Sequence, residues 1–210
     1  MAKVVKYIPD NSKRKLGVRK AHKSKAMQLE DKGQLNLFDN HEQKNLKQSP
    51  ATLLQFTPRL DTFAQALKLD EKDDDNAEFA YLQAIEQGNL IPDSYCNLGI
   101  IYASKGDSVK ALSSFNHCLS SNPSHLEGHY NLANMYFDLK NYELATMHYR
   151  LALQIDPDFT EVYYNIALSL LSESKYDESL NNLKIYCNIV PNDRGARDLM
   201  RRVRILAQTQ

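Results

Sequence analysis

The sequence lacks the features that membrane spans, nucleotide sites and disulfide-bonded folds require. It has no apolar run near the roughly 18 residues that cross a bilayer, and no apolar stretch typical of a secretory signal near its N-terminus. The 7 glycines are never closer than seven positions apart, which excludes a P-loop and a dinucleotide-binding turn. The 3 cysteines form no Cys-x-x-Cys pair, so we expect reduced thiols in a cytoplasmic protein.

The charge is balanced over the whole chain but not along it. The 26 Lys and Arg residues equal the 26 Asp and Glu residues in number. Residues 1–57 hold 12 of the bases and 5 of the acids, a net charge of +7, so residues 58–210 carry −7. Residues 1–57 also hold only 3 of the 19 Tyr and Phe side chains, too few to offset the entropy of ordering the chain. We therefore expect a basic, largely disordered arm attached to an acidic body.

The body repeats with a period of 34 residues. The period is marked by Pro123, Pro157 and Pro191. Further residues of matching type recur in the same register, in five ladders: Leu98, Leu132, Ile166; Gly99, Ala133, Ala167; Tyr102, Tyr136, Leu170; Ala111, Ala145, Ser179; and Phe115, Tyr149, Leu183. Several coincident ladders at one fixed period indicate a repeat architecture.

Each repeat has helical spacing twice over. The turn falls at residues 105–107 in the first full unit, and the proline after the second helix ends that helix. Such a hairpin leaves one apolar side that only a neighbouring hairpin can cover. The residues that share a face are Tyr95, Leu98, Gly99 and Tyr102 in the first helix, and Ala111, Phe115 and Cys118 in the second.

This pattern resembles the tetratricopeptide repeat (TPR) family, whose units are 34-residue helix–turn–helix hairpins. The resemblance implies an all-α fold, a right-handed superhelical stack of hairpins closed by a C-terminal capping helix. Full units are expected at 92–125, 126–159 and 160–193, with the capping helix at 194–208. A degenerate unit is expected at 58–91, within a repeat domain of 58–210; there an acidic run at 71–75 lengthens the turn.

The resemblance also implies a binding surface. In TPR proteins, the side of each first helix that faces away from the hairpin core lines a concave groove for an extended peptide. Here that stripe comprises Asp93, Asn97, Ile100, Glu127, Asn131, Asn134, Asp138, Glu161, Asn165 and Leu168. Asn97, Asn131 and Asn165 form a ladder similar to that of O-GlcNAc transferase, whose amides pair with a peptide backbone of any sequence. The alternative is that these asparagines are surface residues without a specific contact.

The charged members of this stripe are all acidic, and no Lys or Arg joins them. TPR co-chaperones bind acidic chaperone tails through Lys, Arg and Asn, so the missing bases disfavour a chaperone-tail adaptor. A neutral or basic peptide is favoured instead. One candidate is the chain's own segment 1–25, which has 9 bases and one acid.

The arm contains one apolar motif, Gln34-Leu35-Asn36-Leu37-Phe38. It resembles the bacterial sliding-clamp-binding pentapeptide Gln-Leu-x-Leu-Phe, which would make the chain a replication or repair accessory if its source is bacterial. The alternative is a transient anchor of the arm on its own repeats. The basic cluster Lys3–Lys25 would suit a nucleic-acid backbone, an organelle-targeting role or a merely solvated tail.

Catalysis has no support in the sequence. His125 and His129 flank Glu127 but not in the His-Glu-x-x-His order of zinc peptidases, so we expect a surface pair at a helix start rather than a metal site. Cys118 lies on the core face, where packing explains a small apolar side chain. We therefore expect a non-catalytic interaction scaffold without cofactor or metal.

Overall fold

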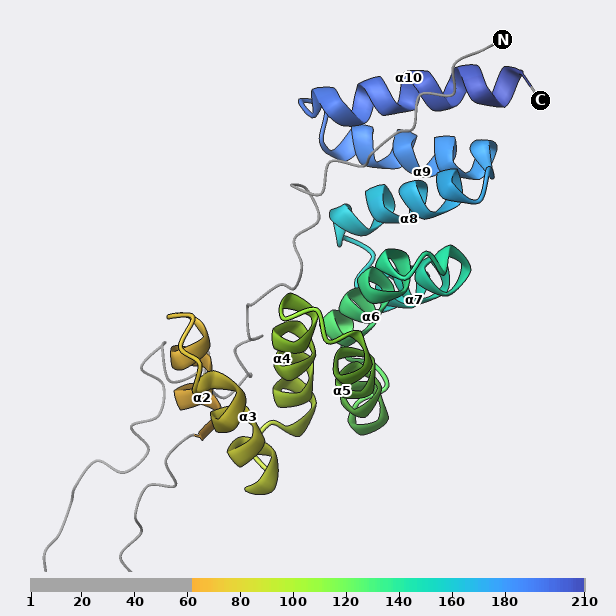
Figure 1. The fold of residues 1–210 in the computed structure, drawn as a ribbon. Coiled ribbons are helices and arrows are strands. Elements are labelled where there is room, and N and C mark those ends of the chain that lie inside the picture. The colour runs from red at the N-terminus through yellow and green to blue at the C-terminus, as the bar shows by residue number, and fades with distance from the viewer. Residues whose placement is uncertain (1–61, 210) are drawn as a thin grey trace, which may run out of the picture.

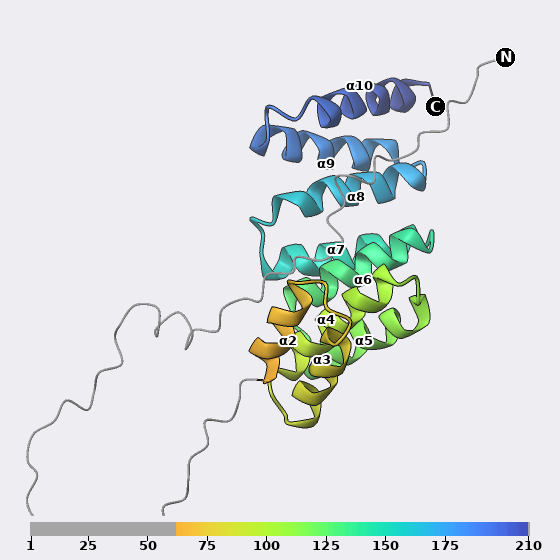
Figure 2. The ribbon, with the colours of Figure 1, turned by 60° about the vertical axis from the view of Figure 1, so that its left-hand side comes forward.

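The computed structural model describes residues 62–209, so the arm, with its motif at 34–38 and its basic cluster, lies outside the described residues. Within 62–209 the chain forms nine α-helices and no strand. Figures 1 and 2 show them stacked in chain order, with the last helix at the end opposite to the first. The all-α fold is therefore confirmed. The helices are α2 (Thr62–Asp70), α3 (Ala77–Glu86), α4 (Ile91–Ser104), α5 (Ser108–Ser121), α6 (Leu126–Asp138), α7 (Tyr142–Ile155), α8 (Thr160–Ser172), α9 (Tyr176–Ile189) and α10 (Arg194–Gln208).

The helices pair as hairpins, each packed on the next. The densest contacts join α4 with α5, α6 with α7, and α8 with α9, and weaker contacts join consecutive hairpins. Three-residue turns at 105–107, 139–141 and 173–175 close these hairpins, whereas six residues, 71–76, separate α2 from α3. The acidic run therefore lengthens the first turn, as predicted.

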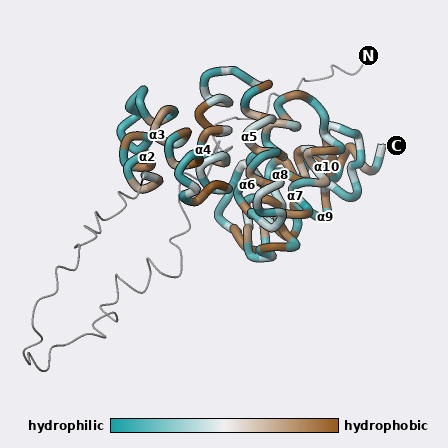
Figure 3. Tube along the Cα trace, turned by 90° about the horizontal axis from the view of Figure 1, so that it is seen from below, coloured by the Kyte–Doolittle hydropathy of each residue, from teal (hydrophilic) through white to brown (hydrophobic). Residues whose placement is uncertain are grey.

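The ladder residues form the core. The large members Leu98, Leu132 and Ile166 are each at most 2% exposed, and the small members Ala111 and Ala145 are fully buried. Figure 3 shows apolar and polar residues alternating along the helices, because each helix buries one face of its turns and exposes another. Complete burial of a side chain such as Leu98 contributes about 1.5–3 kcal/mol to stability.

The close contact between α4 and α5 requires a glycine at position 99. A Cβ atom there would lie 2.5 Å from Cε1 of Phe115, well inside the roughly 3.5–4.0 Å of an ordinary carbon–carbon contact. The Phe115 ring is itself 1% exposed and cannot swing into solvent. The space that a side chain at position 99 would need is therefore occupied by this ring.

The three short turns share one backbone conformation. Gly106, Lys140 and Ser174 lie 34 residues apart and have φ values of 78°, 62° and 61°. Each turn closes with the same bond, in which the following residue donates its N–H to a carbonyl five residues back, as Asp107 does to Tyr102 at 2.9 Å. The left-handed region is free for glycine but costs a side-chain-bearing residue about 1 kcal/mol.

The last helix covers the open end of the stack. Ala196, Leu199 and Val203 of α10 are buried on the side that packs against α9, and Arg197 and Arg201 are exposed. The amphipathic capping helix is therefore present as predicted. Among the described residues, none of the helices has the length and apolar character that a membrane crossing needs.

Candidate functional site

The first helices of the three full units form the inner side of the stack. Helix α4 contacts α6 directly and Asn165 of α8 donates to Tyr130 of α6, whereas a cavity of about 570 Å³ lies between α7, the turn at 173–175 and the start of α9. A stack whose first helices approach more closely than its second helices curves toward the first helices. We call the side formed by α4, α6 and α8 the inner face.

The inner face is acidic. Helices α4, α6 and α8 contain no Lys or Arg, and their four acidic residues are Asp93, Glu127, Asp138 and Glu161. Asp138 and Glu161 are exposed, while Asp93 and Glu127 are partly buried. A ligand that approaches this face therefore meets carboxylates without competing cations from the same helices.

The predicted asparagine ladder lies on these helices but is buried. Asn131 and Asn165 are 3% and 4% exposed. Asn131 Nδ2 on α6 lies 3.5 Å from Cys96 Sγ on α4, and Asn165 Nδ2 on α8 donates to the hydroxyl of Tyr130 on α6 at 3.3 Å. These amides therefore join neighbouring inner helices to one another.

The other members of the predicted stripe are buried in the same way. Asn97 donates to the hydroxyl of Tyr81 at 3.0 Å, and Asn134 accepts a hydrogen bond from Tyr149. Four further side chains that were expected to face a peptide are at most 8% exposed: Asn97, Ile100, Asn134 and Leu168. This is a correction to the expected surface: the centre of the stripe is enclosed by the preceding first helix and by neighbouring second helices such as α3 and α7, so it does not face solvent.

His125 and His129 are not the surface pair that the sequence suggested, since both are 8% exposed. His129 lies between Pro123 and His148, with Nε2 3.0 Å from the Pro123 carbonyl and Nδ1 3.1 Å from Nδ1 of His148. Burial, together with His129, lowers the pKa of His148 to about 4. This histidine is therefore neutral near pH 7.

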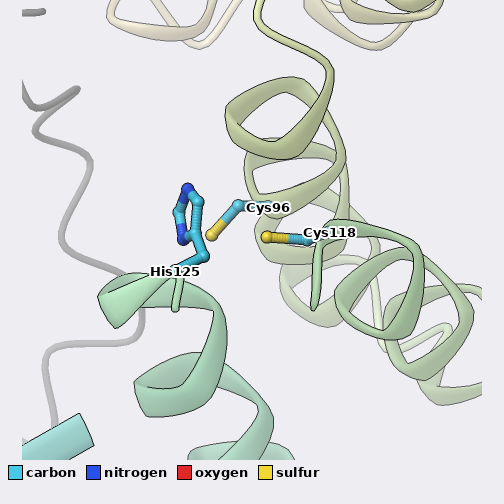
Figure 4. Close-up of side chains that lie close together, drawn as sticks. All are labelled: Cys96, Cys118 and His125. Atoms are coloured by element: carbon cyan, nitrogen blue, oxygen red, sulfur yellow. The ribbon is translucent and has the colours of Figure 1, made fainter. Parts of the chain in front are cut away.

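His125 caps α6 and meets two cysteines. Its Nδ1 accepts a hydrogen bond from the Gly128 N–H at 3.0 Å, which satisfies one of the free amides at the start of the helix. Cys96 of α4 and Cys118 at the end of α5 reach the same place, and their sulfur atoms and a nitrogen of His125 all lie within 4.8 Å of one another. Figure 4 shows the three side chains converging. From the sequence we expected Cys118 to serve packing, and His125 to belong to a surface pair rather than a metal site.

Two carboxylates flank this cluster. Asp93 Oδ1 lies 3.6 Å from Nε2 of His125, and Glu127 Oε2 lies 3.7 Å from its Nδ1. Burial, the largest single influence, opposes a charge on His125, but Asp93, Cys96 and Glu127 together outweigh it and raise the pKa of the imidazole. The repeat register could have indicated that His125 is buried, because the equivalent position one unit later carries the apolar residue Phe159.

The cavity between α7 and α9 lies on the outer side of the stack. Its walls include Met147 and Leu151 of α7, and the exposed Arg150–Glu178 ion pair, 3.2 Å between Nη2 and Oε2, lies at its edge. Thr146 Oγ1 is buried in this wall without a hydrogen-bond partner among the described residues. The cavity is therefore mixed in polarity and does not belong to the acidic inner face.

Two of the repeats match models of a known protein family. Residues 92–125 and 126–159 each match a family model described as tetratricopeptide repeat, which confirms the resemblance over those residues. No curated protein matches the sequence.

Among the solved structures of similar fold are three whose match to this chain covers most of their own length. The first TPR of Spaghetti (RPAP3), bound to the HSP90 peptide SRMEEVD, has a TM-score of 0.53 and 19% identity, over 57% of this chain and 94% of that one. MamA has a TM-score of 0.57 and 19% identity, over 69% and 92%. The TPR2B domain of yeast Sti1, in complex with pHsp70, has a TM-score of 0.50 and 20% identity, over 58% and 100%. At these identities the similarity establishes a shared fold.

Proposed function

We propose that the chain is a non-catalytic interaction scaffold that binds an extended neutral or basic peptide along its inner face. The observation that carries this proposal is the charge of α4, α6 and α8, which have four acidic residues and no Lys or Arg. RPAP3 has the same fold and was solved with the peptide SRMEEVD, which carries three acidic residues. The inner face of this chain is negatively charged and would repel such a peptide, so we infer a ligand that is neutral or positively charged.

The carboxylates, rather than the asparagines, make the contacts in this proposal. Glu161 and Asp138 are exposed and can reach a cation in an extended peptide, whereas the buried amides hold neighbouring helices in place. Exposed carboxylates act through screened Coulomb attraction, so binding weakens as salt rises. The chain's own segment 1–25, with 9 bases and one acid, is a ligand of matching charge. The sliding-clamp motif at 34–38 and a nucleic-acid contact through residues 3–25 stay predictions from the sequence.

A binding titration tests the proposal. A labelled peptide of residues 1–25 is added to the chain that lacks those residues, and fluorescence anisotropy is followed at two salt concentrations. We expect binding that weakens with salt, and weaker binding by the full chain because its own arm competes. The double variant Asp138→Asn/Glu161→Gln is expected to lose affinity about tenfold.

The matched control removes one acid from the outer side. Glu143→Gln on α7 is expected to leave the affinity unchanged, because that side chain is exposed on a second helix. Equal binding of SRMEEVD, or a double variant that binds as tightly as the parent, would refute the acidic inner face as the binding surface.

A further inference from the structure

The joint between the first two full repeats differs in chemistry from the joints that follow. Cys96, Cys118 and His125 meet there, from α4, α5 and the start of α6. One period later the same positions hold Tyr130, Ala152 and Phe159, and the Tyr130 and Phe159 rings pack 4.8 Å apart. In the third joint they hold Tyr164, Tyr186 and Asp193, where the Tyr186 hydroxyl donates to Asp193 at 3.1 Å. The fold therefore does not require thiols or imidazole at this joint, and packing alone does not account for three ligand-type residues arriving together.

The three ligand atoms lie at nearly the spacing that a tetrahedral metal ion requires. They all fall within 4.8 Å of one another, and Figure 4 shows both sulfur atoms directed toward the imidazole. Bond lengths of about 2.3 Å to sulfur and about 2.0 Å to nitrogen place tetrahedral ligand atoms about 3.3–3.8 Å apart. The widest of these separations therefore has to shorten by at most about 1–1.5 Å for the site to close.

Gly128 keeps space open beside two of these atoms. A Cβ atom at this position would lie 2.9 Å from Cys118 Sγ and 3.3 Å from His125 Nδ1. Every other residue type would thus fill the region between the sulfur and the nitrogen. The equivalent positions in the next unit and the capping helix carry Val162 and Ala196, so glycine is not a requirement of the repeat.

The charges around the cluster suit a dication. With an ion on Nδ1 of His125, the opposite ring nitrogen faces Asp93, whose Oδ1 is 3.6 Å away, in the carboxylate–histidine–metal arrangement that orients a ligating imidazole. Glu127 Oε2, 3.7 Å from Nδ1, is the nearest carboxylate oxygen on the metal side. Nδ1 of His125 now accepts a hydrogen bond from the Gly128 N–H. When the ion binds, a metal–nitrogen bond at Nδ1 replaces this one neutral hydrogen bond.

We propose that Cys96, Cys118 and His125 bind one Zn²⁺ ion, with Glu127 as fourth ligand and Asp93 orienting the imidazole. Two thiolates, one imidazole and one carboxylate in a buried site suit Zn²⁺ better than the hard cations Mg²⁺ or Ca²⁺, which take oxygen ligands. The two thiol protons leave to solvent as the ion binds. The ion is structural and crosslinks α4, α5 and α6, so it fixes the angle between two successive repeats.

The test uses the full chain, purified without a histidine tag, reduced and stripped of metal by a chelator. Co²⁺ is titrated first, because cobalt–thiolate bonds give charge-transfer absorption that carboxylates and imidazole alone do not. Zn²⁺ is then titrated against the cobalt complex. We expect one equivalent of Co²⁺ with tetrahedral visible bands, complete displacement by one equivalent of Zn²⁺, and a higher thermal midpoint for the Zn²⁺-loaded chain.

The variants separate the site from adventitious binding. Cys96→Ser, Cys118→Ser and His125→Asn are each expected to lower Zn²⁺ affinity at least about 100-fold. Asparagine at 125 is chosen because its side chain can still cap α6, so the fold is retained. Cys187→Ser is the matched control, since this partly exposed thiol on α9 lies outside the cluster and its loss should leave binding unchanged.

Three results would overturn the proposal. One is the absence of charge-transfer absorption from the reduced chain at stoichiometric Co²⁺. Another is equal Zn²⁺ affinity in the His125→Asn variant while circular dichroism shows it to be folded. The third is oxidation of the Cys96–Cys118 pair to a disulfide in a chain whose reduced form binds no Zn²⁺, which would make the cluster a thiol pair rather than a metal site.

Discussion

Replacement of Gly99 by alanine measures how tightly the first full hairpin is packed. The added Cβ would lie 2.5, 2.7 and 2.8 Å from three carbons of the Phe115 ring, and real Cβ contacts do not fall below 3.0 Å. Alanine in place of glycine inside a helix gains about 1 kcal/mol of intrinsic propensity. Overpacking a buried site costs about 1–3 kcal/mol, and three simultaneous ring contacts place this one at the upper end. We therefore expect Gly99→Ala to lower the free energy of unfolding by about 1–2 kcal/mol.

Urea denaturation followed by circular dichroism measures this change. With an m-value of about 2 kcal/mol/M, the midpoint should fall by about 0.5–1 M. The double variant Gly99→Ala/Phe115→Leu provides the control, because the smaller side chain leaves room for the new methyl group. We expect the two substitutions to couple by at least about 1 kcal/mol in a double-mutant cycle. Additive effects, or a Gly99→Ala chain more stable than the parent, would show that the ring does not restrict this position.

Two further changes test buried polar groups. Tyr149→Phe removes the hydroxyl that donates to Asn134 and leaves a buried amide unpaired among the described residues, so urea denaturation should show a loss of about 1–3 kcal/mol. Tyr163→Phe, which removes an exposed hydroxyl bonded to the Pro157 carbonyl, should change stability by less than about 0.5 kcal/mol; equal losses in the two variants would contradict this ranking. Because burial and a neighbouring imidazole hold the pKa of His148 at about 4, below its ordinary 6.5, the unfolded chain takes up the proton first as the pH falls. The free energy of unfolding should therefore decrease by about 2 kcal/mol more in the parent than in His148→Gln between pH 6.5 and 4. Above pH 7 the two chains should show the same slope. Superimposable profiles of unfolding free energy against pH would argue against a buried neutral imidazole.

The features that the sequence predicted well are those that recur with the repeat. Leu98 and Leu132 share a register position and are both buried, because a helix that packs against its own hairpin partner must place apolar residues at the same place in each unit. The turn at 105–107 was predictable for the same reason, since glycine and a capping aspartate follow the last core residue of the first helix.

The candidate site was predicted less well, because periodicity describes contacts within a hairpin and not the spacing between hairpins. Nine of the 13 residues of α6 are buried, whereas 4 of the 14 residues of α7 are. The first helices are therefore enclosed on two sides, by their own partners and by the preceding hairpin. Asn131 and His125 lie on the side that meets the preceding hairpin, so a rule that assigns one buried face to each helix places both of them in solvent.

The left-handed turn residues have a consequence for the order in which the stack assembles. At Gly106 the turn forms without conformational cost, and Asp107 then caps α5 by accepting the Lys110 N–H at 3.1 Å. At Ser174 the same turn is strained, and Lys175 gives α9 no side-chain cap. A hairpin whose turn is locally favourable can form before its neighbours, whereas one with a strained turn needs an existing surface to pack on. Folding is therefore expected to start in the α4–α5 hairpin and to spread toward the C-terminus.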